Sequence, residues 1–310
     1  MTKLGTSDLD VSRLCLGGNV FGWTADEDAS FAVLDAFADA GGNFVDTADS
    51  YSAWAEGHTG GESETIIGKW LRRRGDRDAV VVATKVGMLR GLDDLKAATI
   101  ERAAEDSLRR LGVDHIDLYY AHRDDPGTSQ EETLAAFDRL VAAGKVRHVG
   151  ASNYSAERLT SALAVAEREG FAKFVALQQA YNLVDRSYEG ELSRAVADHG
   201  LASAPYWGLA KGFLTGKYRP GVTVESARAA AASKYLDERG LRILAALDEV
   251  AEAHDTTQAA VALAWLAEQP TVAAPIASAR TAAQLADLLP ALRLELKADE
   301  VAALTAAARV

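Results

Sequence analysis

Cysteine, metal-binding spacings and nucleotide-binding loops are scarce or absent in this sequence. Its 310 residues include one cysteine, Cys15, so no disulfide can form within the chain. The six histidines show no HxH or HExxH spacing and there is no CxxC, so we expect no metal site. The patterns GxGxxG and GxxxxGK[ST] are also missing. Any dinucleotide must therefore be held by other means than these two loops.

Long apolar runs and excess positive charge are absent too. No run approaches the roughly 18 apolar residues that span a bilayer, and the start MTKLGTSDLD lacks the core of a signal peptide. We expect a cytoplasmic protein with no membrane partner. The net charge is −12, which repels phosphate backbones, so we expect no nucleic-acid partner. The sequence leaves the oligomeric state open.

Short β-branched apolar runs alternate with helical patterns along the whole chain. Apolar residues recur at helical spacing over Glu62–Leu71, Gln130–Val141, Ser155–Glu169, Glu189–Asp198, Arg239–His254 and Gln258–Glu268. Several of the other runs are apolar on nearly every residue, as parallel strands covered on both faces are. The eight candidate strands are Arg13–Leu16, Asn43–Asp46, Val80–Lys85, Ile116–His122, Val146–Ala151, Phe174–Gln178, Leu201–Tyr206 and Thr271–Ile276.

Eight such steps without a Pro/Gly-rich linker predict one domain over residues 1–310, an α/β fold of the (β/α)8 TIM-barrel class. The N-terminal LGTSDLDV predicts a β-hairpin that closes the bottom of the barrel. Two connections, Ser50–Gly61 and Tyr206–Lys234, are long and follow the carboxyl ends of strands. Long loops at that end of a barrel are usually functional.

Ionisable residues close three neighbouring candidate strands. Asp46 ends NFVD, Lys85 ends VVVATK and His122 ends IDLYYAH, while Tyr51 follows five residues after Asp46. All four are expected at the mouth of the barrel. Each also has a purely structural interpretation: Asp46 as a cap, Lys85 as an ion-pair partner, His122 as a core histidine and Tyr51 as loop packing. Spacing alone does not decide between the catalytic and the structural interpretations.

Together the four groups suit the protonation of a carbonyl oxygen. A phenol has a pKa of about 10, so it donates its proton poorly unless a nearby ammonium stabilises the anion. A carboxylate can hold that ammonium, and an imidazole can polarise the carbonyl. None of the four supplies electrons, so a hydride donor is required.

The chain resembles the aldo-keto reductases in the order and spacing of several motifs. These are GGNFVDTADSY, GGESETIIG, ATKVG, LYYAHRDDP, GKVRHVGASNY, LQQAYNLVDR and GLAKGFLTGKY. The resemblance covers essentially the whole chain. It is to bacterial members, and the last motif is also similar to potassium-channel β-subunit-like members.

The resemblance implies a role for each matching residue. Asp46, Tyr51, Lys85 and His122 match the catalytic tetrad, with Tyr51 as general acid, Lys85 lowering its pKa, Asp46 orienting Lys85 and His122 positioning the carbonyl. The implied cofactor is NADPH/NADP+. Its nicotinamide end would be held by Ser152, Asn153, Gln178 and Tyr206, and its pyrophosphate by the backbone around Leu209, Gly212, Leu214 and Gly216, with Lys217.

The segment PIASARTAAQLADLL matches the family's site for the adenosine end, which implies roles for Ser278, Arg280, Gln284 and Asp287. Thr281 and Gln284 form a capping box, so a helix is expected to begin there. A helix N-terminus beside Arg280 suits a phosphate dianion and favours NADPH over NADH. The alternative is an ordinary capped surface helix beside an arginine.

Three positions depart from the family pattern. Trp207-Gly208 stands where the family often has Ser-Pro, so the path of that loop is open. Ser278 stands where Gly is common, and Leu288 replaces an Asn near the adenine, a role that Asp287 can take.

Two other classes of function stay open. Lys85 could form a Schiff base in a barrel lyase. The chain could also be a cofactor-binding sensor or partner module with little turnover. For a reductase, the expected partner is a small-molecule carbonyl substrate, either an aldehyde or a keto-sugar. Trp23, Trp54 and Trp207 near the mouth suit both, because indoles stack on aromatic rings and on sugars.

Overall fold

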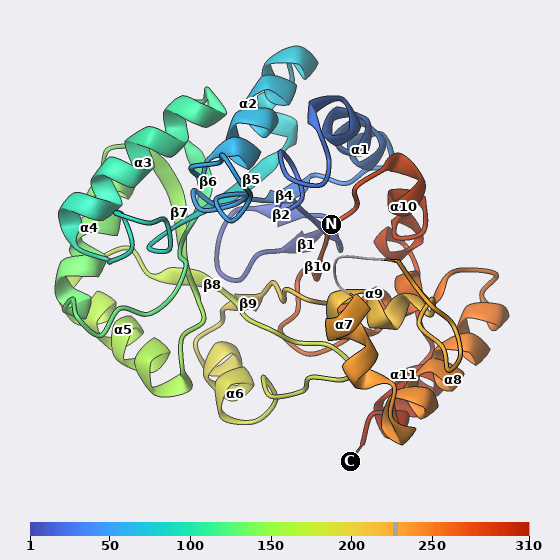
Figure 1. Ribbon diagram of the computed structural model, residues 1–310. Coiled ribbons are helices and arrows are strands. Elements are labelled where there is room, and N and C mark those ends of the chain that lie inside the picture. The colour runs from blue at the N-terminus through green and yellow to red at the C-terminus, as the bar shows by residue number, and fades with distance from the viewer. Residues whose placement is uncertain (226–228, 310) are drawn as a thin grey trace.

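Eight parallel strands form a curled sheet inside a ring of helices (Figure 1). The computed structural model describes residues 1–225 and 229–309. The strands hydrogen-bond in the order β10-β3-β4-β5-β6-β7-β8-β9. The Ser203 N–H donates to the Thr271 carbonyl at 2.7 Å, and the Ala273 N–H donates to the Ser203 carbonyl at 2.9 Å, which joins the two edges. The predicted (β/α)8 barrel is confirmed. The strands are β3 (Cys15–Gly17), β4 (Phe44–Asp46), β5 (Val81–Val86), β6 (Ile116–Ala121), β7 (Val146–Ser152), β8 (Phe174–Gln178), β9 (Ala202–Ser203) and β10 (Ile276–Ala277).

The strands on either side of this closure are shorter than predicted. The predicted strand Thr271–Ile276 overlaps β10 at one residue, since Thr271 has φ 71° and Pro275 has no N–H to donate. Pro205 likewise interrupts the predicted Leu201–Tyr206, of which β9 is the regular part. The barrel is therefore closed by single hydrogen bonds rather than by a long ladder.

Helices cover the outside of the sheet and follow one another around it from α1 to α6 (Figure 1). The six predicted helical stretches are confirmed as α2, α4, α5, α6, α8 and α9. The helices α1, α3, α7 and α11 were not predicted, although Ile100, Ala104, Leu108 and Leu111 give α3 a regular apolar face. The helices are α1 (Glu27–Asp39), α2 (Glu62–Arg74), α3 (Ala97–Leu111), α4 (Gln130–Ala142), α5 (Ala156–Glu169), α6 (Glu191–Asp198), α7 (Ala229–Ala232), α8 (Glu238–Ala253), α9 (Gln258–Ala267), α10 (Ala282–Ala286) and α11 (Ala298–Ala307).

Short 3-10 helices complete the chain. They are η1 (Arg77–Ala79), η2 (Ala210–Thr215), η3 (Ser233–Tyr235) and η4 (Leu289–Leu292). The predicted loop Tyr206–Lys234 thus contains η2, α7 and the start of η3, and its residues 226–228 lie outside the described residues. The predicted loop Ser50–Gly61 contains only turns and bends.

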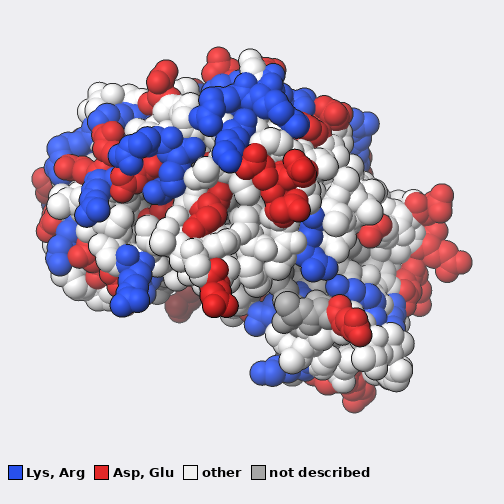
Figure 2. Space-filling view, turned by 45° about the horizontal axis from the view of Figure 1, so that its top comes forward, with Lys and Arg blue, Asp and Glu red and all other residues white. Residues whose placement is uncertain are grey.

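Ion pairs link neighbouring helices on the outer ring. Lys69 of α2 pairs with Glu27 of α1 at 2.6 Å, and Arg168 of α5 pairs with Glu131 of α4 at 3.0 Å. Basic and acidic side chains lie interspersed over much of the face in Figure 2. All four of these side chains are well exposed, so each pair contributes little to stability.

The predicted N-terminal hairpin is confirmed and lies at the bottom of the barrel. Its strands, β1 (Thr2–Lys3) and β2 (Asp10–Val11), are antiparallel. Leu4, Leu9 and Val11 are buried in one apolar cluster with side chains from the strands. Gly5 has φ 58°, and a Cβ there would lie 2.2 Å from the carbonyl oxygen of Val175 in β8. Only glycine permits this close approach of the hairpin to the barrel.

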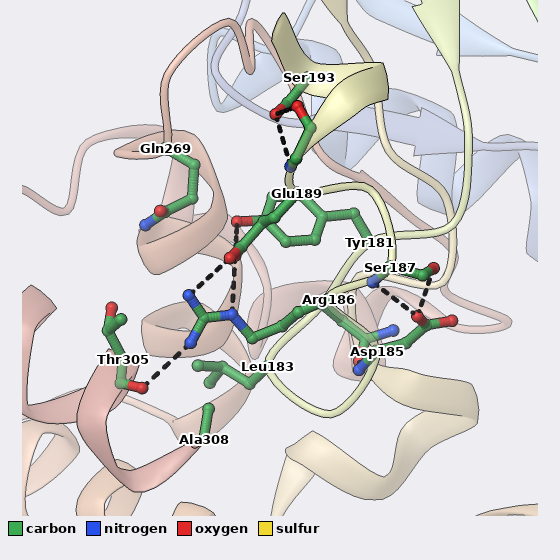
Figure 3. Close-up of polar contacts among 12 residues, drawn as sticks. Tyr181, Leu183, Asp185, Arg186, Ser187, Glu189, Ser193, Gln269, Thr305 and Ala308 are labelled. Carbon is green, nitrogen blue, oxygen red and sulfur yellow. Dashed lines mark hydrogen bonds and ion pairs between the residues drawn. The ribbon is translucent and has the colours of Figure 1, made fainter. Parts of the chain in front are cut away.

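The C-terminal helix α11 is fastened to the loop that follows β8. The Arg186 guanidinium donates to both carboxylate oxygens of Glu189, at 2.7 and 2.8 Å, and to the Thr305 carbonyl at 3.1 Å (Figure 3). The Tyr181 hydroxyl donates to the same carboxylate at 2.7 Å. The loop after β8 is thereby held in place from the outside of the barrel. No helix among the described residues is long and apolar enough to cross a membrane.

Candidate active site

A cavity of about 650 Å³ opens at the carboxyl ends of the strands. Long loops follow β4 and β9 at this end, as the sequence predicts. Fourteen of the seventeen predicted site residues line the cavity. They are Asp46, Tyr51, His122, Ser152, Asn153, Gln178, Tyr206, Leu209, Gly212, Lys217, Ser278, Arg280, Gln284 and Asp287.

Lys85 lies behind this wall and is fully buried. Its Nζ donates to both carboxylate oxygens of Asp46 at 2.7 Å and to the Thr47 carbonyl at 2.7 Å. It also contacts the Tyr51 hydroxyl at 2.9 Å. Burial lowers the pKa of Lys85, and the Asp46 carboxylate opposes that effect. The contacts with Asp46 thus fix the position of the Lys85 ammonium next to the Tyr51 hydroxyl.

Tyr51 connects this buried pair to the cavity. Its hydroxyl donates to Asp46 Oδ2 at 3.0 Å and receives the Lys85 contact. Desolvation and the Asp46 carboxylate together raise the pKa of Tyr51 well above its usual value. Burial and Asp46 therefore set the direction of the net pKa shift, and the predicted contribution of Lys85 to lowering the pKa of Tyr51 stays a prediction. The phenol holds its proton at neutral pH.

His122 lies beside Tyr51, with the two ring centroids 6.1 Å apart. Burial lowers the pKa of His122 well below its usual value, and the charges of Lys85 and Arg123 add to this. Its Nδ1 is buried without a hydrogen-bond partner among the described residues. The ring is therefore neutral and has hydrogen-bonding capacity to spare.

The residues predicted to hold a nicotinamide are joined to the tetrad by hydrogen bonds. Gln178 Nε2 donates to Asp46 Oδ1 at 2.8 Å. Asn153 Nδ2 donates to the His122 carbonyl at 2.9 Å and to Ser152 Oγ at 3.0 Å, while its Oδ1 accepts from the Tyr206 hydroxyl at 2.7 Å. This fixes the Tyr206 ring at the cavity wall. Asn153 thereby links the Tyr206 hydroxyl to the backbone carbonyl of His122.

The loop after Tyr206 has strained backbone. Trp207, Ala210 and Lys211 have φ of 56°, 47° and 59°, the left-handed region that side chains other than glycine rarely adopt. Each such residue costs about 1–3 kcal/mol and persists only where its surroundings hold it. Buried Asn182 does so by donating from Nδ2 to the Trp207 carbonyl at 3.0 Å, while its Oδ1 accepts from two backbone N–H groups. The path of this loop, left open by the sequence, is settled by these contacts.

Two residues predicted along the pyrophosphate are not brought to the cavity. Leu214 is fully buried and its N–H donates to the Leu209 carbonyl. The Gly216 N–H donates to the Phe213 carbonyl, and a Cβ at this position would overlap Gln258. Gly216 therefore permits η2 to pack against the start of α9.

The predicted capping box at Thr281 forms in part. Thr281 accepts from the Gln284 N–H at 3.2 Å, but Gln284 Oε1 accepts from the N–H of Arg280, one residue before the cap. The helix that follows, α10, has only five residues, so its dipole is weak. Arg280 is exposed at the cavity, and no acidic side chain of the described residues pairs with it. The guanidinium, more than the helix, makes this end suitable for an anion.

Several cavity residues were not predicted. Asn19 follows β3 and its Oδ1 accepts from Ser278 Oγ at 2.5 Å, while Met88 follows β5. Applying the strand-end argument to every strand would have found both, since each lies two residues beyond a strand end. The described residues contain no group of three His, Cys, Asp or Glu side chains that could hold a metal.

Comparisons with known proteins agree with this geometry. A model of the Aldo/keto reductase family matches residues 13–309. The protein named Uncharacterized oxidoreductase YrpG, from Bacillus subtilis (strain 168), is 37% identical and the match covers 95% of this chain and 91% of that protein. Protein tas of Escherichia coli (strain K12) is 32% identical, with coverage of 99% and 97%. Norsolorinic acid reductase stcV of Emericella nidulans is 34% identical, with coverage of 94% and 76%.

Proposed function

Because this chain belongs to the aldo/keto reductase family, we propose that it reduces an aldehyde or ketone to an alcohol with NADPH, using Tyr51 as general acid. The family and its oxidoreductase relatives support carbonyl reduction in general. The observation that carries the finer proposal is the 2.9 Å contact between Lys85 Nζ and the Tyr51 hydroxyl at the wall of the cavity. We propose further that residues 1–310 form one domain.

Tyr51 would donate the proton and Lys85 would stabilise the phenolate left behind. The raised pKa of Tyr51 keeps the proton on the phenol until a carbonyl oxygen begins to gain negative charge. The Lys85 ammonium is already in contact with the phenol oxygen and needs no rearrangement to meet the new charge. Asp46 keeps that ammonium oriented through two 2.7 Å contacts.

His122 would orient the substrate. A neutral imidazole next to Tyr51 can donate one hydrogen bond to the carbonyl oxygen and so polarise the bond. With Tyr51 as the second donor, the oxygen is held between two N–H or O–H groups. The NADPH cofactor, when bound, supplies the hydride that is added to the carbonyl carbon.

The remaining cavity residues suit a dinucleotide. The Tyr206 ring, fixed by Asn153, offers a flat surface at the tetrad end. Lys217 and Arg280 supply positive charge further along an acidic protein. We propose that Ser152, Asn153, Gln178 and Tyr206 hold the nicotinamide end, Leu209, Gly212 and Lys217 the pyrophosphate, and Ser278, Arg280, Gln284 and Asp287 the adenosine end with its 2′-phosphate.

The geometry disfavours a Schiff-base lyase. An amine that attacks a carbonyl must be neutral, free and in reach of the substrate. Lys85 is fully buried, does not line the cavity and contacts Asp46, Thr47 and Tyr51 at once. Treatment with borohydride and a carbonyl compound should leave the protein mass unchanged.

The direct test is NADPH oxidation, followed at 340 nm, against aldehydes, α-dicarbonyls and keto-sugars. Tyr51→Phe should lower kcat by about 10²–10⁴-fold, because it removes the proton donor. The Kd for NADPH, measured by calorimetry, should stay within a few-fold. Equal loss of turnover and of cofactor affinity would contradict the role of Tyr51. Binding of NADPH without oxidation across the panel would favour a sensor or partner module.

Arg280→Ala tests the choice of cofactor. It should weaken NADPH binding by about 10–100-fold, since a charge-assisted contact to the 2′-phosphate is lost, and should change NADH binding much less. Arg194→Ala, on α6, is the matched control. Its guanidinium hydrogen-bonds to the Gly190 carbonyl and, among the described residues, to no other group, and Arg194 does not line the cavity. Equal weakening of NADPH and NADH by Arg280→Ala would exclude the phosphate contact.

A further inference from the structure

Large apolar side chains exposed to water gather at the mouth of the cavity. Of the seven among the described residues that are more than a third exposed, four line it. Trp23 is 38% exposed, Met88 45%, Trp207 50% and Trp54 52%. They come from the loops after β3, β4, β5 and β9, so sequence proximity does not explain the cluster. An apolar rim around a cavity marks a surface that binds an apolar ligand.

The indole rings on one side of this rim continue from the tetrad. The Trp54 ring is 6.2 Å from the Tyr51 ring, and the Trp23 ring is 5.5 Å from the Trp54 ring, both in edge-to-face contact. Aromatic surface therefore extends without a break from the proposed proton donor to the solvent. Because each ring supports the next, the wall is formed before any ligand arrives.

The indole on the other side of the rim is held there against backbone preference. Trp207 has φ 56°, and Asn182 fixes its carbonyl at 3.0 Å. The indole packs edge-to-face on Tyr206 at 5.1 Å, and Lys211 Nζ lies 4.6 Å from the centre of its ring. Strain maintained by a dedicated buried side chain indicates a function for the position of Trp207.

Polar groups are few in this part of the cavity. The charged lining residues outside the tetrad are Lys211, Lys217, Arg280 and Asp287, and all of them come from segments 211–217 and 280–287. The polar side chains in contact with the indole rings are Tyr51 at Trp54, and Tyr206 and Lys211 at Trp207. A sugar with several hydroxyl groups would leave most of them without partners, which disfavours it.

Resting on the proposed reductase function, we propose that the substrate is an aryl aldehyde or aryl ketone with more than one fused or linked ring. Its ring system contacts Trp54, Trp23 and Trp207, while its carbonyl oxygen contacts Tyr51 and His122. Indole faces bind flat apolar rings well, and Met88 adapts to their outline. The rim thereby selects for the size of the ring system and the tetrad reacts with the carbonyl.

The test compares 2-naphthaldehyde, benzaldehyde, propanal and dihydroxyacetone as substrates with NADPH. We expect kcat/KM for 2-naphthaldehyde to exceed that for benzaldehyde by about 10-fold, mainly through KM, and dihydroxyacetone to be the poorest of the four. Trp54→Ala and Trp207→Ala should each reduce the ratio of 2-naphthaldehyde to propanal by about 5–10-fold, and Trp54→Phe should restore most of it. Leu241→Ala on α8, an exposed apolar side chain outside the cavity, should leave the ratio unchanged.

Asn182→Asp tests whether the hydrogen bond from Asn182 to the Trp207 carbonyl fixes the position of Trp207. It keeps an acceptor for the two N–H groups and removes the donor to the Trp207 carbonyl. At a pH where the new carboxyl is ionised, we expect the same loss of ring preference as in Trp207→Ala, with a lower melting temperature because a buried carboxylate is costly. If Asn182→Asp keeps the ring preference, the position of Trp207 does not depend on this contact and that part of the inference is overturned.

Calorimetric titration with 2-naphthalenemethanol separates this inference from the proposed function. Binding that weakens at least 5-fold in Trp54→Ala, with no NADPH oxidation by any carbonyl, would overturn the reductase and keep the aromatic site. NADPH oxidation with a substrate preference that Trp54→Ala and Trp207→Ala do not change would overturn the aromatic site and keep the reductase. A higher kcat/KM for dihydroxyacetone than for 2-naphthaldehyde would also overturn it.

Discussion

Asp46 and Asp117 are both buried at an end of a barrel strand and both contact cations, yet they lie at opposite ends of the barrel. Asp46 closes β4 at the top, where it meets Lys85, Tyr51 and Gln178. Asp117 lies near the start of β6 at the bottom, where it accepts from Arg77 at 2.7 Å, from Arg147 at 3.0 Å and from the Val82 N–H at 2.9 Å.

Asp46 and Asp117 differ in the chemical type of their partners. Arg77 and Arg147 are held on the outside of the barrel and keep their charge at any ordinary pH. Arg147 also contacts Asp8 of the hairpin at 3.1 Å, so the lower network fastens the bottom of the barrel. In the upper network the chain of contacts ends on a phenol at a cavity. Asp117 thus links fixed charges at the bottom of the barrel, whereas Asp46 contacts a phenol that can take part in the proposed proton transfer.

The largest expected effect follows Asp46→Asn. The amide keeps the shape of the side chain but removes the charge that holds the Lys85 ammonium, so stabilisation of a Tyr51 phenolate is weakened. We expect kcat/KM to fall by about 10²–10⁴-fold, with NADPH affinity within a few-fold, measured by initial rates and calorimetry. A fall of less than 3-fold would show that Asp46, like Asp117, is only structural.

The next largest effect is expected at the other end of the barrel, in Asp117→Asn. It removes the countercharge of two arginines in a buried site, so the free energy of unfolding in urea should decrease by about 3 kcal/mol. Values of kcat/KM should stay within about 2-fold for the folded fraction, because no contact of Asp117 reaches the cavity. Exposed Asp114→Asn, three residues earlier, is the control and should change neither quantity. Loss of activity without loss of stability would break the contrast between the two ends.

The sequence predicted the charged residues at the top of the barrel but not those at the bottom. Asp46, Lys85 and His122 stand out because each closes an otherwise apolar strand run, and a parallel barrel must bring such ends together. Asp117 gives no such signal, since it lies inside the run IDLYYA and its partners come from segments 30 and more residues away. The short closing strands were overestimated. Pro205 and Pro275 are visible inside the predicted runs and cannot donate to a ladder, whereas the positive φ of Thr271 is not readable from the sequence.

The sequence did not predict the direction of the pKa shift of Tyr51 or the strained backbone at Trp207. The pKa of Tyr51 depends on how much water its hydroxyl loses, which no spacing reports. Trp207 is readable as an aromatic near the mouth, but its left-handed backbone depends on the distant Asn182 amide. Leu214 and Gly216 match a motif in the chain and still do not line the cavity, because Leu214 is buried in the core and Gly216 packs against Gln258.

A third buried aspartate, Asp49, differs from Asp46 and Asp117 in its hydrogen bonding. It is fully buried, and neither carboxyl oxygen has a hydrogen-bond partner among the described residues. The groups that face it are Glu64 of α2, Arg110 of α3 and Lys85 of β5. Burial, with the charge of Glu64, raises the pKa of Asp49 to about 8, and the two cations only partly offset this. Asp49 is therefore protonated in the folded protein at neutral pH.

The raised pKa of Asp49 predicts an effect of opposite sign, a gain in stability on substitution. Its pKa is about 3.9 when unfolded and about 8 when folded, so the folded state binds more protons between these values. The resulting stability is complete below about pH 4, decreases as the pH rises to about 8 and is constant above that. Asp49→Asn removes this slope. A pKa rise from about 3.9 to about 8 is worth about 5 kcal/mol, so at pH 8 the variant should unfold with up to about that much more free energy than the parent, less the cost of burying an amide without partners. Exposed Asp76→Asn should show the parent's pH dependence in the same urea titrations at pH 4 to 9. Equal slopes for Asp49→Asn and the parent would contradict the raised pKa of Asp49.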